Sequence, residues 1–371
     1  MEKWQREMQK SIRKPDELIK KFHQIDLSSI NNVISIFPMR ITPYYFSLIQ
    51  DFNDPIFKQA VPDEKELQDI VGIPDPLSEE EQSPVPCLVH RYPDRALLMV
   101  TNICAVFCRF CTRKRLIGRR AVRREDVKRA IKYVSENQQI REIIISGGDP
   151  LTLSDEILEE ILLELKKINH LEVIRIGTRM PCTLPSRITL NLCKILKKYH
   201  PLYINTHFNH PNELTEEAKK ALEMLADSGI PLGNQSVLLK GVNDDVKVLQ
   251  ELFKKLLKFR VKPYYLYQAD LVEGTHHFRT PLGKGIEIMQ RIQGNLSGMC
   301  IPKFVLDSPG GGGKIPLFPR YLQKVLPDGI LLKNYQGKNV FYPEINEKGK
   351  MASENVQLAF DFEEIRGDKK N

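Results

Sequence analysis

Three cysteines lie within eight residues in the stretch Cys104-Ala-Val-Phe-Cys108-Arg-Phe-Cys111, and no fourth cysteine follows nearby. A closed structural zinc site uses four protein ligands, and the cubane iron–sulfur cluster of an electron carrier normally has four thiolates. Three thiolates leave one iron of such a cluster open to a substrate or cofactor. The spacing therefore predicts a reactive cluster, whereas the alternative is a loop with three unrelated cysteines.

Two adjacent glycines follow a strand-like run in Ser146-Gly-Gly-Asp-Pro150. Glycines without a β-carbon let a ligand approach backbone atoms that a side chain would shield. A plain turn between a strand and a helix is the competing interpretation.

Four consecutive glycines precede a lysine in Pro309-Gly-Gly-Gly-Gly-Lys314. A Walker phosphate loop is excluded, because it needs glycine at position 308 and Ser or Thr at 315, where this chain has Ser308 and Ile315. So many glycines cost backbone entropy, which indicates an unusual conformation or a close approach. A lysine held there could form a Schiff base with a carbonyl cofactor such as pyridoxal phosphate (PLP). The competing interpretation is a surface lysine.

The elements that must position these residues follow a strand–helix rhythm from about residue 95. We expect strands at 96–101, 142–146, 173–178, 202–208, 232–239 and 261–267, with helices near 124–136, 154–168, 186–199, 215–228, 244–258 and 284–294. Ser154 is placed to cap the second helix. Six consecutive units favour parallel strands joined by right-handed crossovers. Further strands are expected at 304–307 and 330–332.

The suggestive side chains lie where these strands end, and chemistry gathers at the carboxyl ends of strands in a barrel. The cysteines follow the first strand and the glycine pair follows the second, while His207, Gln235 and Asp270 belong to the last three. We therefore expect one shared site.

The whole chain of 371 residues is 42% hydrophobic and 27% charged, which is ordinary for a soluble globular protein. No apolar run is long enough to span a bilayer, no secretory signal is visible, and unpaired cysteines fit a reducing cytoplasm. The net charge of +8 is partly concentrated in residues 113–124, a basic run that lacks interleaved aromatic residues. This run is more typical of a site for acidic ligands than of an RNA-binding surface.

The motifs together resemble the lysine 2,3-aminomutase family of the radical S-adenosylmethionine (SAM) superfamily. The resemblance spans roughly residues 40 to 345. It rests on Cys104-x3-Cys-x2-Cys111, Ser146-Gly-Gly-Asp149, His207-Phe-Asn-His-Pro211, Asn234-Gln-Ser236, His276-His-Phe-Arg-Thr-Pro281 and Asp307-Ser-Pro-Gly-Gly-Gly-Gly-Lys314.

The resemblance implies an α/β fold: a partial, three-quarter radical-SAM TIM barrel of six βα units. We expect a helical N-terminal extension over residues 1–85, the barrel over 86–300, and the PLP-lysine loop with a short C-terminal segment over 301–371.

The resemblance also implies roles for individual residues. Cys104, Cys108 and Cys111 would bind a [4Fe–4S] cluster, and Gly147, Gly148, His207 and Gln235 match positions that contact SAM. Lys314 matches the catalytic lysine that carries PLP, and Arg91, Tyr92 and Arg95 match residues around that cofactor. Arg113 matches the residue that holds the substrate carboxylate, for which an arginine fork is suited.

Asp270 and Asp307 match the two carboxylates that bind the distal ammonium of lysine. Two negative charges there favour a cation and repel the second carboxylate of glutamate. Solvated acids at strand ends are the competing interpretation.

No cysteine follows Cys300, so the chain lacks the cysteine-rich C-terminal segment that supplies structural zinc in some members, and we expect no zinc.

The implied activity is an isomerase that converts L-lysine to β-lysine by a migration started by a 5′-deoxyadenosyl radical. A branch that makes β-lysine for elongation factor P is the nearest alternative, followed by an arginine or glutamate 2,3-aminomutase. A radical-SAM RNA-modifying enzyme and a non-catalytic iron–sulfur protein belong to other classes. The implied partners are the small-molecule substrate, an electron donor such as flavodoxin or ferredoxin, and further copies of the chain in a dimer or tetramer. No nucleic acid or membrane partner is expected, and the expected location is the cytoplasm.

Overall fold

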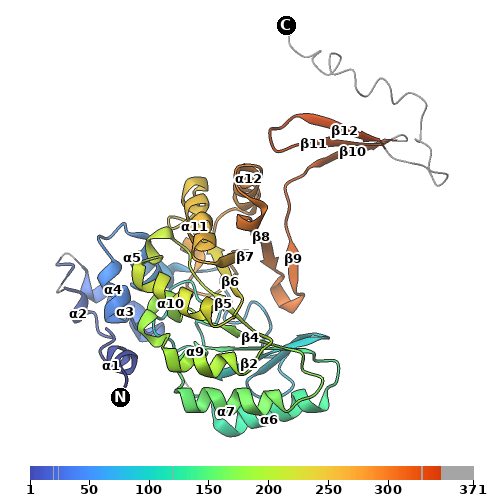
Figure 1. Cartoon of the computed structure of the whole chain (residues 1–371). Helices are drawn as coiled ribbons and strands as arrows, with labels where there is room; N and C mark the ends of the chain where they lie inside the picture. Colours follow the sequence, from blue (N-terminus) through green and yellow to red (C-terminus); the bar gives the residue numbers. More distant parts are fainter. Residues whose placement is uncertain (20, 24, 120, 327–328, 344–371) are drawn as a thin grey trace.

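The computed structural model describes residues 1–343 apart from residues 20, 24, 120, 327 and 328. Within these residues the main sheet has nine strands, which lie side by side in sequence order and curl into a partial barrel (Figure 1). The strands are β1 (Leu88–Tyr92), β2 (Arg95–Thr101), β3 (Glu142–Gly147), β4 (Val173–Gly177), β5 (Leu202–Thr206), β6 (Leu232–Leu238), β7 (Val261–Gln268), β8 (Lys303–Asp307) and β9 (Lys314–Pro316).

The predicted α/β partial barrel is confirmed. Strands β2 to β7 are the six expected parallel strands, and β8 extends them in the same direction. The antiparallel edge strands β1 and β9 were not expected from the sequence. Strand β9 has only three residues and follows the glycine loop, so it carries no alternating pattern that could be recognised.

Helices follow the strands and cover the outer face of the sheet (Figure 1). They are α6 (Arg124–Glu136), α7 (Asp155–Lys166), α8 (Met180–Thr183), α9 (Leu190–Lys197), α10 (Glu216–Asp227), α11 (Val246–Lys258) and α12 (Leu282–Ile292). Several begin with a side chain that accepts a backbone N–H, as an N-cap should. Ser154 caps α7 as expected, and Thr189, Thr215 and Asp245 cap α9, α10 and α11.

Short 3₁₀ turns connect these elements: η1 (Glu64–Gln68), η2 (Pro150–Thr152), η3 (Pro185–Arg187), η4 (Pro211–Glu213), η5 (His276–Phe278), η6 (Gly298–Cys300) and η7 (Pro309–Gly311).

The apolar run at 142–146 predicts a strand that is buried on both faces, but the strands bury alternate residues instead. In β3, Ile143 and Ile145 are fully buried, whereas Ile144 and Ser146 on the other face line a cavity. Side chains alternate across a strand, so one face packs under the helices and the other surrounds the barrel interior. The curled sheet thus leaves room for a site inside it.

Residues 69–85 contain no helix, whereas the part of the chain before them contains α1 (Lys3–Gln9), α2 (Asp16–Ile19), α3 (Leu27–Ile36), α4 (Pro43–Leu48) and α5 (Pro55–Ala60). They lie on one side of the barrel and share its hydrophobic core, to which Tyr45 and Ile56 contribute fully buried side chains (Figure 1). The helical spacing of apolar residues over 44–52 predicts a longer helix, but α4 ends at Leu48. The carboxylate of Asp54 accepts the N–H groups of Gln50 and Ile56, which turns the chain and caps α5.

The described C-terminal part forms a separate antiparallel sheet of β10 (Leu322–Leu326), β11 (Gly329–Lys333) and β12 (Asn339–Pro343), which extends away from the barrel (Figure 1). The expected strand at 330–332 lies within β11. The rest of the expected C-terminal segment, including the tail for which we expected no zinc, lies outside the described residues. None of the helices described is both long and apolar enough to cross a bilayer.

The packing of α12 against β8 can be tested at two glycines of this helix. A β-carbon at Gly285 would overlap the ring of Phe304, a buried residue of β8, whereas one at Gly283 would meet nothing within 4 Å. We expect Gly285→Ala to lower the free energy of unfolding by about 1–3 kcal/mol through overpacking. Gly283→Ala, its control, should leave stability unchanged or raise it by up to about 1 kcal/mol. Urea unfolding would measure both, and equal stabilities would contradict the packing described here.

Candidate active site

A cavity of about 620 Å³ lies inside the curled sheet and extends to the carboxyl ends of the parallel strands. Every side chain or glycine that the sequence suggested for the site lines it. These are Arg91, Tyr92, Arg95, Cys104, Cys108, Cys111, Arg113, Gly147, Gly148, His207, Gln235, Asp270, Asp307 and Lys314. The topology therefore brings the suggested residues together, as expected for strand ends in a barrel.

The cysteine loop after β2 is attached to the N-terminal extension by backbone hydrogen bonds. The N–H of Phe107 donates to the carbonyl of Arg40, and the N–H of Arg109 donates to the carbonyl of Gln59, each at 2.9 Å. In the residues that the structure describes between β2 and α6, this loop has no helix or strand of its own. Its shape therefore depends on partners that are distant in the sequence.

Glu66 of η1 binds two basic residues of the same loop. Its carboxylate accepts hydrogen bonds from Arg109 Nε at 2.9 Å and from Lys114 Nζ at 2.6 Å, and all three residues are buried. Burial alone would raise the pKa of Glu66, but the charges of Arg109 and Lys114 lower it below its usual value. The loop is thus tied to the extension by a buried ionic cluster.

The thiols of Cys104, Cys108 and Cys111 line one wall of the cavity. Burial, followed by the negative charge of Asp149, raises the pKa of Cys104 well above its usual value. Burial, followed by the charge of Cys108, raises the pKa of Cys111 to about 11. Among the described residues, no three Cys, His, Asp or Glu side chains already stand in a metal-binding arrangement, so the thiols would adjust when a cluster binds. Three soft sulfur donors on one wall fit an iron–sulfur cluster.

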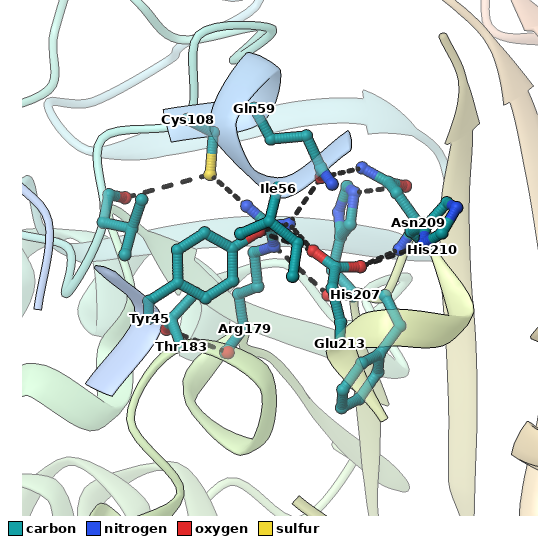
Figure 2. Close-up of polar contacts among 12 residues, drawn as sticks. Tyr45, Ile56, Gln59, Cys108, Arg179, Thr183, His207, Asn209, His210 and Glu213 are labelled. Atoms are coloured by element: carbon teal, nitrogen blue, oxygen red, sulfur yellow. Dashed lines mark hydrogen bonds and ion pairs between the residues drawn. The ribbon is translucent and has the colours of Figure 1, made fainter. Parts of the chain in front are cut away.

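Arg179, which follows β4, lies beside Cys108 in a buried network (Figure 2). Its guanidinium donates to Cys108 Sγ at 2.9 Å, Glu213 Oε1 at 2.6 Å, Gln59 Oε1 at 2.7 Å and the Tyr45 hydroxyl at 3.1 Å. Burial would raise the pKa of Glu213, but Arg179 and the Tyr45 hydroxyl lower it. The network thus joins the cysteine loop to α4 and α5.

His207 is neutral in this environment, because burial, followed by the charge of Arg179, lowers its pKa to about 3. Asn209 fixes the tautomer. Its Nδ2 donates to Gln59 and its Oδ1 accepts the N–H of Val237, so Oδ1 must also accept the proton of His207 Nε2 at 3.1 Å. The Nδ1 atom of His207 is therefore left as a hydrogen-bond acceptor.

The glycine pair after β3 meets the start of the cysteine loop. A β-carbon at Gly147 or Gly148 would overlap the backbone of Thr101 or Ile103, and Gly147 has a φ of 133°. The N–H of Gly148 donates to the carbonyl of Thr101. In this structure the glycines are thus needed for close contact between two strand ends, a reason that the sequence pattern did not reveal.

The glycine loop has the unusual conformation that its sequence predicts. Gly310, Gly311 and Gly313 have φ values of 73°, 80° and 87°, a region that residues with a β-carbon rarely adopt. The loop turns the chain so that β9 pairs antiparallel with β8, which places Lys314 directly opposite Asp307.

Lys314 forms an ion pair across these strands. Its Nζ lies 3.0 Å from Asp307 Oδ1 and 3.2 Å from Oδ2, and 5.3 Å from the ring centre of Tyr267. The backbone N–H of Lys314 donates to the Tyr92 hydroxyl at 2.9 Å. A primary ammonium is therefore already bound by one of the two suggested substrate carboxylates.

Basic side chains of β1 and β2 surround the same end of the cavity. Arg91 donates to Gln82 Oε1 at 2.7 Å, and one of its nitrogens lies 3.9 Å from Asp307. The guanidinium of Arg95 lies 3.8 Å from the ring centre of Tyr92. This mixture of cations and an aromatic hydroxyl fits an anionic, planar cofactor such as PLP.

Asp270, after β7, has a carboxylate oxygen free for a ligand. Its Oδ2 accepts the hydroxyl of Thr112 at 2.9 Å, but its buried Oδ1 has no partner among the described residues. Burial, followed by the negative charge of Asp307, raises the pKa of Asp270 to about 7. A buried carboxylate oxygen that lies near a second carboxylate favours binding of a ligand with a cationic group.

A second cavity of about 710 Å³ adjoins the first, and Leu77, Asp270 and Asp307 line both. The carboxylates therefore lie where the two spaces meet, and groups longer than an ammonium could extend past them.

Glu79 is a site residue that sequence reasoning missed, because the prolines around it, Pro74, Pro76, Pro84 and Pro86, are typical of a linker. Both of its oxygens bind Arg113, with Nε–Oε2 and Nη2–Oε1 distances of 2.9 and 2.7 Å. Burial opposes ionisation, yet Arg113 lowers the pKa of Glu79. Gln82 of the same segment donates to the carbonyl of Gly311. The segment therefore connects Arg113 with the glycine loop.

The basic run at 113–124 is largely neutralised within the chain. Besides Arg113 and Lys114, Arg115 pairs with Asp75, and Arg124 pairs with Glu160. The run therefore presents less uncompensated positive charge than its sequence suggests.

Comparison with known proteins agrees with this geometry. A model of the radical SAM superfamily matches residues 98–253, and a lysine-2,3-aminomutase model matches residues 289–370. The L-lysine 2,3-aminomutase of Clostridium subterminale is 52% identical over 311 residues, covering 82% of this chain and 75% of that protein. The enzyme of the same name from Methanococcus maripaludis is 51% identical over 334 residues, covering 88% and 77%.

A glutamate 2,3-aminomutase of Clostridioides difficile is 48% identical over 313 residues, covering 83% of this chain and 74% of that protein. All of these relatives cover most of the chain at about half identity, which shows common descent although it does not distinguish their substrates. The chain therefore belongs to the lysine 2,3-aminomutase family of the radical SAM superfamily.

Proposed function

We propose that the protein converts L-lysine to β-lysine (3,6-diaminohexanoate) by moving the amino group from the α-carbon to the β-carbon. One observation supports lysine above the other substrates of the family. The ammonium of Lys314 is bound by Asp307, near an Asp270 oxygen that has no hydrogen-bond partner in the described part of the chain. A lysine ammonium entering this cavity meets carboxylates suited to it.

The cofactors are a [4Fe–4S] cluster, SAM and PLP. When bound, the reduced cluster and SAM supply a 5′-deoxyadenosyl radical that removes a hydrogen atom from the substrate, and PLP supplies a π system for the migrating nitrogen.

In the proposed site, Cys104, Cys108 and Cys111 hold the cluster. Gly147, Gly148, His207 and Gln235 hold SAM, next to the cysteines in the same cavity. The free Nδ1 atom of neutral His207 accepts a hydrogen bond there, which a protonated imidazole could not do.

Lys314 anchors PLP, with Arg91, Tyr92 and Arg95 around it. The hydroxyl of Tyr92 holds the backbone N–H of Lys314, which limits the positions open to the reactive nitrogen. Glu79 holds the Nε and Nη2 atoms of Arg113 and so orients its guanidinium before the substrate arrives. Arg113 binds the substrate carboxylate through Nη1, whose contacts with Ser146 and Gly147 are long, at 3.4 Å.

Asp270 and Asp307 bind the distal ammonium, and two carboxylates repel the second carboxylate of glutamate. An arginine 2,3-aminomutase is the second candidate, because the adjoining cavity offers space beyond the carboxylates for a guanidinium. Enzymes that make β-lysine for attachment to elongation factor P would catalyse the same reaction and form the same product.

The reduction of the cluster requires a one-electron donor, for which flavodoxin or ferredoxin is suitable. We infer a cytoplasmic homo-oligomer, a dimer or tetramer, without nucleic acid or membrane partners and without zinc.

The first prediction concerns Lys314. Reconstituted, reduced protein with SAM and PLP under anaerobic conditions should form β-lysine from lysine, and Lys314→Ala should form none, since PLP loses its anchor. Mass-detected chromatography would measure products from lysine, arginine and glutamate. Lys303→Ala, at the exposed start of β8, is the matched control and should keep the activity. Arginine conversion that exceeds lysine conversion would replace the proposed substrate.

The second prediction concerns Asp270. Loss of one partner of a buried charge pair costs about 2–5 kcal/mol, so Asp270→Asn should raise KM for lysine by about 30-fold or more. The surface variant Asp227→Asn, which removes an exposed partner of Arg260, should leave KM unchanged.

The same carboxylate predicts a pH dependence. Acidification protonates Asp270 and removes a charge that binds the ammonium, so KM for lysine should rise as pH falls below about 7. Steady-state kinetics between about pH 6 and about 8.5 would measure this rise in KM. An aspartate with the ordinary pKa of about 4 would stay ionised over this range and would leave KM unchanged. Asp270→Asn should abolish the dependence, and its persistence in the variant would assign the titration to another group.

A further inference from the structure

Arg179 has no assigned role in the proposed reaction, although its guanidinium contacts a cysteine of the cluster loop. It is buried, and its nitrogens are directed to Cys108, Glu213, Tyr45 and Gln59 (Figure 2). The Nη1 atom donates to the sulfur of Cys108, whereas Nη2 donates to the three oxygen acceptors. A purely structural ion pair with Glu213 would not need the contact with the sulfur.

The position of the guanidinium is fixed by the N-terminal extension. Tyr45 belongs to α4 and Gln59 to α5, and each places an oxygen on Nη2. Behind the side chain, Thr183 Oγ1 donates to the carbonyl of Arg179, and Thr42 Oγ1 donates to the carbonyl of Thr183. The extension thus holds a buried cation in contact with the cysteine loop.

A cation beside a cluster ligand changes the reduction of that cluster. Reduction adds one electron from the external donor, with no proton taken up and no bond made or broken, so the cluster becomes more negative by one charge. A fixed positive charge and an N–H donor on a ligand sulfur favour the more negative state, more strongly in a site of low dielectric. Glu213 acts in the opposite direction, because its carboxylate offsets the charge of Arg179.

We infer that Arg179 is a positioning residue that orients Cys108 and raises the reduction potential of the cluster, with Glu213 limiting the effect. This inference rests on the proposed role of Cys108 as a cluster ligand. It gives the N-terminal extension a function in electron uptake.

The test is the midpoint potential of the reconstituted cluster, measured by anaerobic spectroelectrochemical titration of the full-length protein. Arg179→Gln should reduce the ratio of reduced to oxidised cluster by at least about tenfold at a given potential, which is a shift of about −59 mV for one electron. Glu213→Gln should shift the potential in the opposite direction. Greater access of water alone would not produce opposite shifts from the two ends of one ion pair.

A matched control is Arg187→Gln. Arg187 is also a fully buried arginine paired with an acid, Asp155, but it contacts no cysteine in the described structure. This variant should lose stability without a change in potential. If Arg179→Gln does not fold, Glu213→Gln and Arg179→Lys can still be measured. Arg179→Lys keeps the positive charge but not the guanidinium fork, so its cluster should have a potential between that of the parent and that expected without a cation at this position.

The outcomes distinguish this inference from the proposed function. Variants with the potential of the parent, or an equal shift in Arg187→Gln, would overturn the role of Arg179 even if the parent isomerises lysine. A parent protein that binds no cluster, as judged by its iron content and visible absorbance, would overturn the proposed function itself.

Discussion

The site depends on a buried carboxylate, Glu66, that binds Arg109 and Lys114 together. In its described residues, the cysteine loop between β2 and α6 has no helix or strand, so no regular ladder of backbone hydrogen bonds fixes its shape. Its form comes from this ionic cluster and from the hydrogen bonds to Arg40 and Gln59. Removal of one partner would leave a buried charge uncompensated, at a cost of about 3–5 kcal/mol. The extension is therefore part of the catalytic framework.

The barrel, unlike the cysteine loop, is shaped by the regular alternation of side chains along its strands. Alternate residues of each strand pack under the helices, and their neighbours line the cavity, so one pattern builds the core and the site together. In β7, for example, Leu266 is fully buried while Tyr265 and Tyr267 line the cavity. The same cavity thus collects groups of different character: three cysteine sulfurs, a neutral imidazole, two carboxylates and several arginines.

The fold and most of the proposed site could be predicted from the sequence, because both rest on local patterns. The six strand–helix units have alternating or apolar runs with capped helices, and Cys104, Gly147 and Lys314 stand in motifs with fixed spacing. The missed features are pairs between distant residues. Glu79 is 34 positions from Arg113, and Gln59 is 120 positions from Arg179, with nothing at either position to mark the partner. Such contacts follow from the packing of whole elements, which no single pattern encodes.

The short strand β9 has a consequence for how this family can vary in length. Surface loops usually accept insertions at little cost. Lys314, however, lies opposite Asp307 in an antiparallel ladder, and a slip of one residue in a strand turns every side chain to the other face. A single-residue insertion between positions 308 and 313 that shifts this ladder would direct Lys314 away from the cavity while the barrel stays intact. The number of residues in this loop is thus under a constraint as strict as the identity of the lysine.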